Sequence, residues 1–187
     1  MRAALWLAVL FFPVSELILA AARHSRGTTA RAIDRGSLWI NWAGITAGVG
    51  LAIASEWVRS ARMALPVHLV VWLALACIVV GLAVRWTAII TLGRLFTVDV
   101  AIHDEHPVVQ HGLYRFVRHP SYSGMMLAFV GVGLAFYNWL SLVALLVPVS
   151  LVVANRIRHE ERTLLDTLGA PYAEYCARTK RLVPGVF

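Results

Sequence analysis

Long apolar runs separated by arginine-rich gaps constrain this chain more than any other feature. The runs cover roughly residues 3–22, 38–58, 66–90 and 122–155. About 20 helical residues, at 1.5 Å each, cross the hydrocarbon core of a bilayer. The last run has 34 residues and Asn138 near its middle, so it predicts two short spans joined by a turn at Tyr137–Trp139. The pattern therefore predicts an all-α integral membrane protein with about five transmembrane helices.

The composition agrees with this reading and excludes several others. Apolar residues make up 59% of the chain and charged residues only 14%, about half the share found in soluble domains. These values exclude a disordered chain, a nucleic-acid-binding domain and an ordinary cytosolic enzyme domain. We expect residues 1–187 to form a single membrane domain, with three spans in 1–91 and the polar motifs in 92–187.

The distribution of cations predicts the orientation. Fourteen of the 17 Lys and Arg residues, Arg85 at the end of the third span among them, fall on one side of the five-span arrangement, and three fall on the other. The positive-inside rule places the richer side in the cytoplasm, with the N-terminus outside and the C-terminus inside. A cleaved signal peptide is the alternative for residues 3–22, because Ala20–Ala22 resembles a cleavage site. Pro13, Glu16 and the single preceding Arg favour a span.

Polar residues concentrate in two segments, 92–124 and 156–187, which the predicted topology brings together at the cytoplasmic face. A pocket there, beside lipid, would suit a polar cofactor and a lipophilic acceptor. His103, His106, His111 and His119 have no zinc-like spacing, so we predict no metal site. Cys77 and Cys176 suggest only small packing residues.

The first segment reads His111-Gly112-Leu113-Tyr114 and then Arg118-His119-Pro120-Ser121-Tyr122-Ser123-Gly124. Pro120 excludes helical geometry at His119 and can open a helix, whose N-terminus favours a carboxylate. In the second segment Arg156 and Glu160 are four residues apart, on one helix face, and Glu161 follows. Gly169-Ala170-Pro171 then predicts a helix stop and a second short helix, followed by a basic tail at Arg181–Pro184.

Together these motifs, over about 94–184, resemble the isoprenylcysteine carboxyl methyltransferase family, and phospholipid N-methyltransferases share much of the pattern. The resemblance implies an S-adenosylmethionine-dependent membrane methyltransferase without a Rossmann fold. Its cofactor pocket would lie between the loop before the last helical hairpin and the C-terminal helices. By motif match, the cofactor-binding residues would be His111, Tyr114, His119, Tyr122, Gly124 and Glu161. Arg156 and Glu160 would face the acceptor and act as catalytic residues.

The expected reaction is methyl transfer to a lipophilic acceptor, foremost a carboxylate such as that of isoprenylcysteine. The alternatives are N-methylation of a phospholipid headgroup, a non-enzymatic membrane binding protein, and a membrane reductase. We expect contact with membrane lipids, no nucleic acid and no obligate protein partner. The eukaryotic enzymes that act on prenylated proteins have more spans and longer loops, so the compact chain suggests a different lipophilic acceptor.

Simpler readings remain for several of these residues. Arg156 and Glu160 would also fit a plain ion pair at the membrane surface, and Arg118 an interfacial anchor. Tyr172 and Tyr175 are better explained by packing than by catalysis. Glu16 lies inside an apolar run, which is costly for a carboxylate. A neighbouring span or the outer surface would satisfy it, and the sequence assigns it no role.

Overall fold

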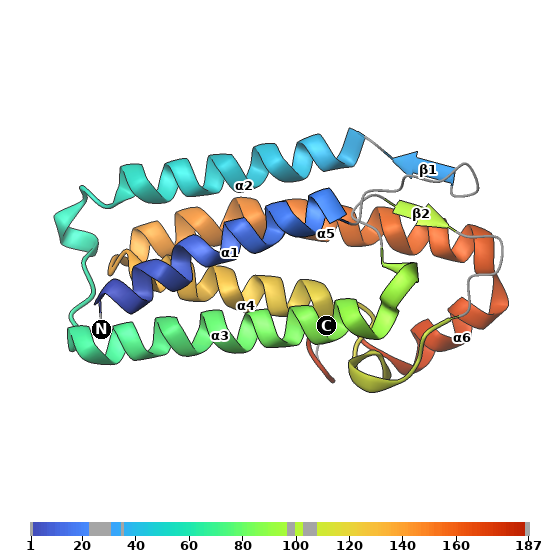
Figure 1. The fold of residues 1–187 in the computed structure, drawn as a ribbon. Helices are drawn as coiled ribbons and strands as arrows, with labels where there is room; N and C mark the ends of the chain where they lie inside the picture. Colours follow the sequence, from blue (N-terminus) through green and yellow to red (C-terminus); the bar gives the residue numbers. More distant parts are fainter. Residues whose placement is uncertain (1, 23–30, 35, 97–99, 103–107, 186–187) are drawn as a thin grey trace.

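The protein is described by a computed structural model that covers residues 2–22, 31–34, 36–96, 100–102 and 108–185. Five long helices lie lengthwise beside one another, and a sixth lies at one end of the bundle (Figure 1). Each predicted span coincides with one long helix, so the predicted helical architecture is confirmed. The helices are α1 (Arg2–Ala22), α2 (Gly36–Ser55), α3 (Val67–Leu92), α4 (Pro120–Ala135), α5 (Trp139–Leu168) and α6 (Ala170–Arg178).

A short two-stranded ribbon departs from the all-α expectation. Strand β1 (Arg31–Asp34) pairs antiparallel with β2 (Val100–Ile102), with Arg31 opposite Ile102. The first strand precedes α2 and the second follows α3, and both lie at the end of the bundle that carries α6 (Figure 1). The pairing gives hydrogen-bond partners to backbone N–H and C=O groups of both strands. The two strands are far apart in the sequence, so neither segment by itself predicts the pairing.

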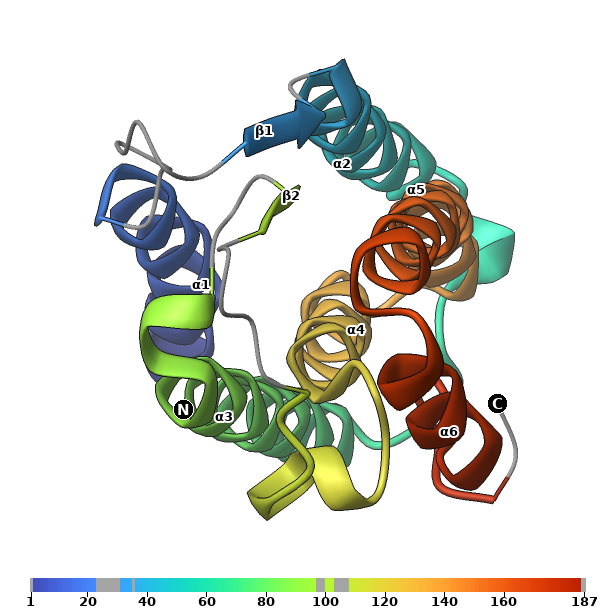
Figure 2. The same cartoon turned by 90° about the vertical axis from the view of Figure 1, so that its right-hand side faces the viewer.

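Two glycine-mediated contacts set the order of the helices. Seen end-on, α4 lies between α3 and α5, with α1 beside α3 and α2 beside α5 (Figure 2). A Cβ on Gly124 of α4 would lie 2.5 Å from the Gly81 carbonyl oxygen of α3, so only glycine permits this close crossing. A Cβ on Gly44 of α2 would lie 2.4 Å from Val152 Cγ1 of α5. The glycine at position 44 therefore lets α2 and α5 pack closely.

The α4–α5 turn forms where the sequence predicts it. The Asn138 side chain caps α5 by accepting hydrogen bonds from the backbone N–H groups of Leu140 and Ser141, at 2.9 and 3.3 Å. Its amide nitrogen donates to the carbonyls of Ser55 and Val58 at the end of α2. One buried side chain thus starts α5 and also fixes the loop that follows α2.

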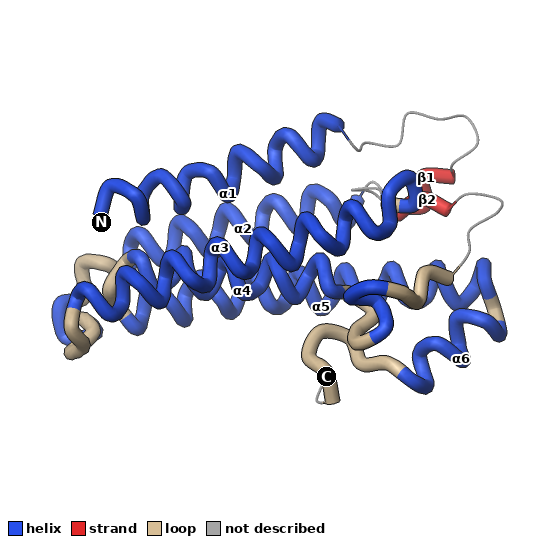
Figure 3. The backbone as a smooth tube through the Cα atoms, turned by 60° about the horizontal axis from the view of Figure 1, so that its bottom comes forward, coloured by secondary structure: helices blue, strands red, loops and turns tan. Residues whose placement is uncertain are grey.

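Helix α5 joins the apolar bundle to the polar end of the molecule. Its 30 residues span about 45 Å, which exceeds the roughly 30 Å of a hydrocarbon core. Its last three turns therefore extend past the apolar part and lie beside α6 and the loop before α4 (Figure 3). Glu160 and Glu161 belong to this extension rather than to a separate helix, and Arg156 lies directly before it.

By length and apolar composition, α3 and α5 are each long enough to cross a membrane. Within the part of the chain whose side chains are described, Leu7–Leu19, Trp42–Ser55 and Pro120–Ala135 are also apolar helical segments but are shorter.

Candidate functional site

Three basic side chains contact the buried carboxylate of Glu161 at the polar end of the bundle. Glu161 Oε1 accepts a hydrogen bond from Arg118 Nε at 2.9 Å and lies 3.3 Å from His119 Nε2. Glu161 Oε2 accepts from Arg181 Nε at 2.9 Å. The Glu161 side chain is only 8% exposed. We call these four residues, Arg118, His119, Glu161 and Arg181, the Glu161 cluster; it unites the loop before α4, helix α5 and the segment after α6.

Local backbone structure explains how these segments meet. Helix α4 begins at Pro120, and His119 precedes it with φ −125°, outside helical geometry, as the sequence predicts. The backbone N–H groups of Arg118 and His119 donate to the carbonyls of Lys180 and Arg181, at 2.8 and 3.0 Å. This pairing draws the basic tail alongside the start of α4 and brings the Arg181 side chain to Glu161.

The surrounding cations keep Glu161 ionised. Burial by itself would raise the pKa of this carboxyl, but hydrogen bonds from His119, Arg181 and Arg118 outweigh burial and hold the pKa well below its usual range. The same contacts raise the pKa of Arg181. The cluster is therefore a preorganised group of opposite charges.

A second group of polar side chains surrounds Glu160, which directly precedes Glu161 on α5. The Tyr122 hydroxyl donates a hydrogen bond to Glu160 Oε2 at 3.0 Å and also interacts with Arg156. Arg156 is only 3% exposed, which does not support an exposed surface ion pair. The rings of His119 and Tyr122 lie 5.7 Å apart. Tyr122 therefore stands between the Glu161 cluster and the Arg156–Glu160 pair.

The other sequence-predicted residues lie around these two groups. Tyr114 is buried, and its hydroxyl reaches the Ala88 carbonyl of α3 at 3.4 Å. Gly124 packs at the α3–α4 crossing, which accounts for the glycine without a ligand. His111 is exposed, and no hydrogen bond or ion pair among the described residues joins it to the Glu161 cluster. His103 and His106 lie outside the described residues. Within the described residues, no three His, Cys, Asp or Glu side chains group as metal ligands do.

Tyr175 has the packing role expected for it. Its hydroxyl donates to the Tyr114 carbonyl at 2.6 Å and lies 3.4 Å from that of Val117, which ties α6 to the loop before α4. Burial raises the pKa of Tyr175 to about 12, so the phenol stays neutral.

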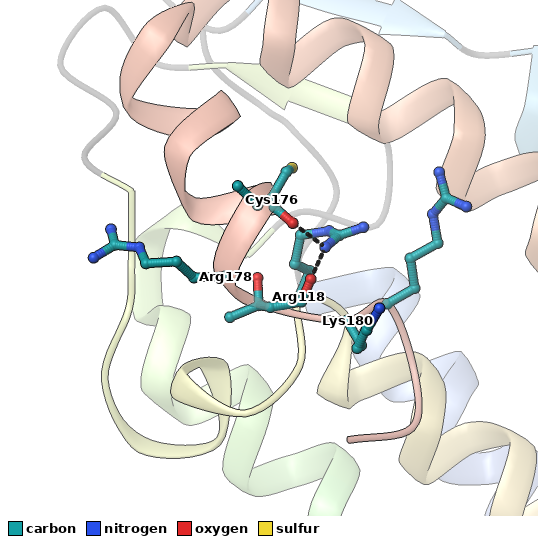
Figure 4. A pocket seen from close by; sticks show the side chains of 7 residues that line it. Arg118, Cys176, Arg178 and Lys180 are labelled. Atoms are coloured by element: carbon teal, nitrogen blue, oxygen red, sulfur yellow. Dashed lines mark hydrogen bonds between the residues drawn. The ribbon is translucent and has the colours of Figure 1, made fainter. Parts of the chain in front are cut away.

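A pocket of about 300 Å³ lies beside the Glu161 cluster (Figure 4). The Arg118 side chain lies beside the segment that carries Cys176, where it donates hydrogen bonds to the carbonyls of Cys176 and Thr179 (Figure 4). The pocket is strongly basic. Its lining residues are Arg118, Cys176, Ala177, Arg178, Thr179, Lys180 and Arg181.

The sequence did not predict two contributors to the site. Arg118 and Arg181 both occur in the quoted motifs, yet nothing in the linear pattern shows that they share one carboxylate. Arg85, which the sequence places at the end of the third predicted span, has a partner that the sequence does not show. It lies within α3, 6% exposed, and pairs with Glu16 of α1. A neighbouring span therefore satisfies Glu16, one of the two alternatives that the sequence left open.

Comparison with known proteins places the chain in a family. The sequence profile of the isoprenylcysteine carboxyl methyltransferase (ICMT) family matches residues 72–166. The chain belongs to the ICMT family. A rice protein (Oryza sativa subsp. indica) named "Probable protein-S-isoprenylcysteine O-methyltransferase" is 31% identical over 98% of this chain and 97% of its own length. "Protein-S-isoprenylcysteine O-methyltransferase B" of Arabidopsis thaliana is 34% identical over 97% of this chain and 92% of its own.

A solved ICMT-family structure shares the fold. It is described as the eukaryotic intramembrane Ras methyltransferase ICMT, and it matches with a TM-score of 0.60 at 24% identity. The match covers 82% of this chain and 55% of that one. The rice relative aligns over nearly its full length, so it is about as short as this chain. A short chain is therefore compatible with the name protein-S-isoprenylcysteine O-methyltransferase. The length argument for a different acceptor is therefore wrong. The similarity also extends well beyond the motif region, into the N-terminal helices.

Proposed function

We propose that this chain transfers a methyl group from S-adenosylmethionine to the carboxylate of a membrane-embedded isoprenylcysteine, giving a methyl ester. One observation carries the proposal. Glu160 and Glu161, adjacent on α5, face two different polar groups. His119, directly before α4, reaches Glu161, and Tyr122, in the first turn of α4, reaches Glu160. A donor site and an acceptor site then share one wall. The names of the relatives support the choice of acceptor.

The charges of the Glu161 cluster fit the cofactor. The amino-acid end of S-adenosylmethionine carries an ammonium and a carboxylate, and the cluster offers one carboxylate and two guanidinium groups. Glu161 would bind the ammonium while Arg118 and Arg181 bind the carboxylate, in charge-assisted hydrogen bonds. His119 and Tyr114 would border this site, and the assignments of His111 and Gly124 stay predictions. When bound, the cofactor supplies a methyl group already activated by its sulfonium.

The protein must then align the acceptor with the methyl group and exclude water from the site. A carboxylate acceptor is ionised at neutral pH and needs no base. We assign Arg156 to bind and orient it, since this guanidinium is buried beside Tyr122. Tyr122 would hold Glu160 away from the incoming anion through its hydrogen bond, which limits repulsion between the two carboxylates.

We infer that the acceptor and the site share a membrane location. Many large apolar side chains face outward along the bundle, where lipid would cover them. We propose that residues 1–187 form one five-span domain, with the N-terminus outside and the Glu161 cluster at the cytoplasmic face. The long exposed apolar side chains that support this include Leu7, Phe11, Trp72, Ile90 and Leu151.

A membrane assay with labelled S-adenosylmethionine tests the function. Prenylcysteine, phosphatidylethanolamine and a host lipid extract are offered in parallel. We expect base-labile label, the signature of a methyl ester, on prenylcysteine alone. Base-stable label on phosphatidylethanolamine would instead establish headgroup N-methylation, with Glu160 as the base. Absence of label and of S-adenosylhomocysteine binding would leave a binding protein or a reductase.

A further inference from the structure

A second buried ionic group links three helices outside both halves of the proposed site. Arg85 of α3 makes a bidentate pair with Glu16 of α1, with Nε–Oε1 and Nη2–Oε2 distances of 2.5 Å. Its remaining nitrogen, Nη1, donates to Ser121 of α4, to Oγ at 2.9 Å and to the carbonyl at 3.3 Å. We call Glu16, Arg85 and Ser121 the Arg85 network.

Stability does not by itself account for this network. Taking two charges out of water is costly, and apolar residues of similar volume often replace a buried ion pair without loss of stability. Helices α1, α3 and α4 also have apolar contacts of their own, such as the edge-to-face pair of Phe12 and Phe129. The fork geometry of Arg85 does something that apolar packing cannot, because it fixes a direction as well as a distance.

That direction leads to the first turn of α4. Ser121 lies two residues after His119 and directly before Tyr122, the two side chains that reach Glu161 and Glu160. The backbone of Arg85 approaches the same turn, since a Cβ on Gly124 would lie 2.6 Å from the Arg85 amide nitrogen. Main chain and side chain of one residue therefore define where this turn of α4 lies.

We propose that Arg85, oriented and neutralised by Glu16, is a positioning residue that sets the first turn of α4 so that His119 and Tyr122 face their two glutamates together. Helix α1 is then part of the machinery through Glu16. The expected effect on turnover rests on the proposed function. The expected effect on the orientation of His119 is independent of the proposed function.

The first test removes one hydrogen-bond acceptor. Ser121→Ala abolishes the Oγ contact and leaves the Glu16–Arg85 pair intact. Ser141→Ala is the matched control: its hydroxyl is also buried and also joins two helices, donating to the Ala52 carbonyl at 2.8 Å, but it lies beside the Asn138 turn. We expect Ser121→Ala to weaken S-adenosylhomocysteine binding several-fold and to shift the imidazole NMR resonances of His119. Ser141→Ala should change neither.

The second test separates positioning from folding. The double variant Glu16→Leu/Arg85→Met removes both charges at similar volume, so its melting temperature in detergent should stay near that of the wild type. Because small misplacements of reacting groups cost up to about 100-fold in rate, we expect kcat/KM for prenylcysteine to fall roughly 10- to 100-fold. The affinity for S-adenosylhomocysteine should fall with it, and a loss of folded protein alone would not change that affinity.

The outcomes are distinct. The double variant could keep the wild-type affinity for S-adenosylhomocysteine and the wild-type His119 resonances. In that case the Arg85 network only connects the helices and does not position α4. If the double variant does not fold, Ser121→Ala decides by the same two measurements. A wild-type protein that methylates no prenylcysteine would overturn the proposed acceptor. The His119 resonances of the ligand-free protein would still decide whether Arg85 positions α4.

Discussion

At the scale of single residues, the charge of Glu161 holds the candidate donor site together. Its carboxylate receives hydrogen bonds from segments that are 43 and 20 residues away in the chain. Removing that charge takes away the carboxylate that Arg118 and Arg181 share. The loss should therefore affect ligand binding more than the loss of an ordinary surface carboxylate.

We expect Glu161→Gln to weaken S-adenosylhomocysteine binding by about 1–3 kcal/mol, the usual value for a buried hydrogen bond to a charged group. His119→Ala should act in the same direction, since its ring lies 3.3 Å from the same oxygen. Isothermal titration calorimetry measures both, with the exposed Glu174→Gln on α6 as control. Unchanged affinity in Glu161→Gln and His119→Ala would remove the cluster from the donor site.

The depressed pKa of Glu161 also predicts a pH dependence of stability. The folded state keeps this carboxylate ionised below the ordinary carboxyl pKa of about 4.3, whereas the unfolded chain takes up a proton there. The stability that the cluster contributes is thus complete above that value and is lost as the pH falls toward the lower folded pKa. Melting temperatures in detergent should decline less below pH 4.5 for Glu161→Gln than for the wild type. Parallel declines would contradict the ionised cluster.

Arg156 and Glu160 should separate chemistry from donor binding. For a carboxylate acceptor, Arg156→Ala should lower turnover more than Glu160→Gln, with little change in donor affinity and a rate that is flat across neutral pH. An amine acceptor predicts the reverse order and a rate that rises with pH. The control is Arg158→Ala, an exposed cation on the same helix. Full turnover in both variants would end the catalytic assignment.

At the scale of helices and turns, much follows from the sequence. Apolar runs locate five helices, Pro120 marks the start of α4, and Asn138 marks the turn into α5. Four features could not be predicted from the sequence: the continuity of α5, the β1–β2 ribbon, the burial of Arg85 and the pairing of Arg118 with Lys180. Each depends on contacts between distant segments, and a single sequence shows the polarity of a residue but not its partner.

The turn at Asn138 predicts a graded loss of stability. Asn138→Ala removes the helix cap and takes from the Ser55 and Val58 carbonyls one of their two donors, so we expect a loss of about 1–3 kcal/mol. Asn138→Asp keeps a capping oxygen and loses only the donor, and should fall between. Thermal unfolding in detergent measures the order. Equal stability of Asn138→Ala and the wild type would contradict the role assigned to this side chain.

The α3–α4 crossing tests whether Gly124 serves packing or the cofactor. Packing predicts that Gly81→Ala and Gly124→Ala lower the melting temperature alike, because each new Cβ would lie 2.5–2.6 Å from backbone of the other helix. Gly50→Ala is the control, since no atom lies within 4 Å of its added Cβ. Loss of S-adenosylhomocysteine binding in a normally stable Gly124→Ala would favour the cofactor contact.

At the scale of the whole molecule, the charge asymmetry fixes the orientation that we propose. Fourteen of the 17 Lys and Arg residues fall on the side that we assign to the cytoplasm, and three fall on the other. Segments 23–37, 92–120 and 156–187 should therefore be cytoplasmic. Single cysteines at Ser37 and Ser60, in a Cys77→Ala/Cys176→Ala background, are labelled from outside intact cells with an impermeant maleimide. We expect reaction at position 60 only, and labelling at position 37 alone would reverse the topology.

The pairing of the tail with the loop before α4 has a consequence for biogenesis. Lys180, Arg181 and Leu182 supply carbonyls to Arg118, His119 and Ser123, and Arg181 completes the shell around Glu161. Synthesis runs from the N-terminus, so α1 to α4 leave the ribosome before these residues do. The nascent chain can thus insert and pack its apolar helices while the proposed donor site is still open. Maturation of the enzyme is then a late step, reached only when the segment after α6 folds back.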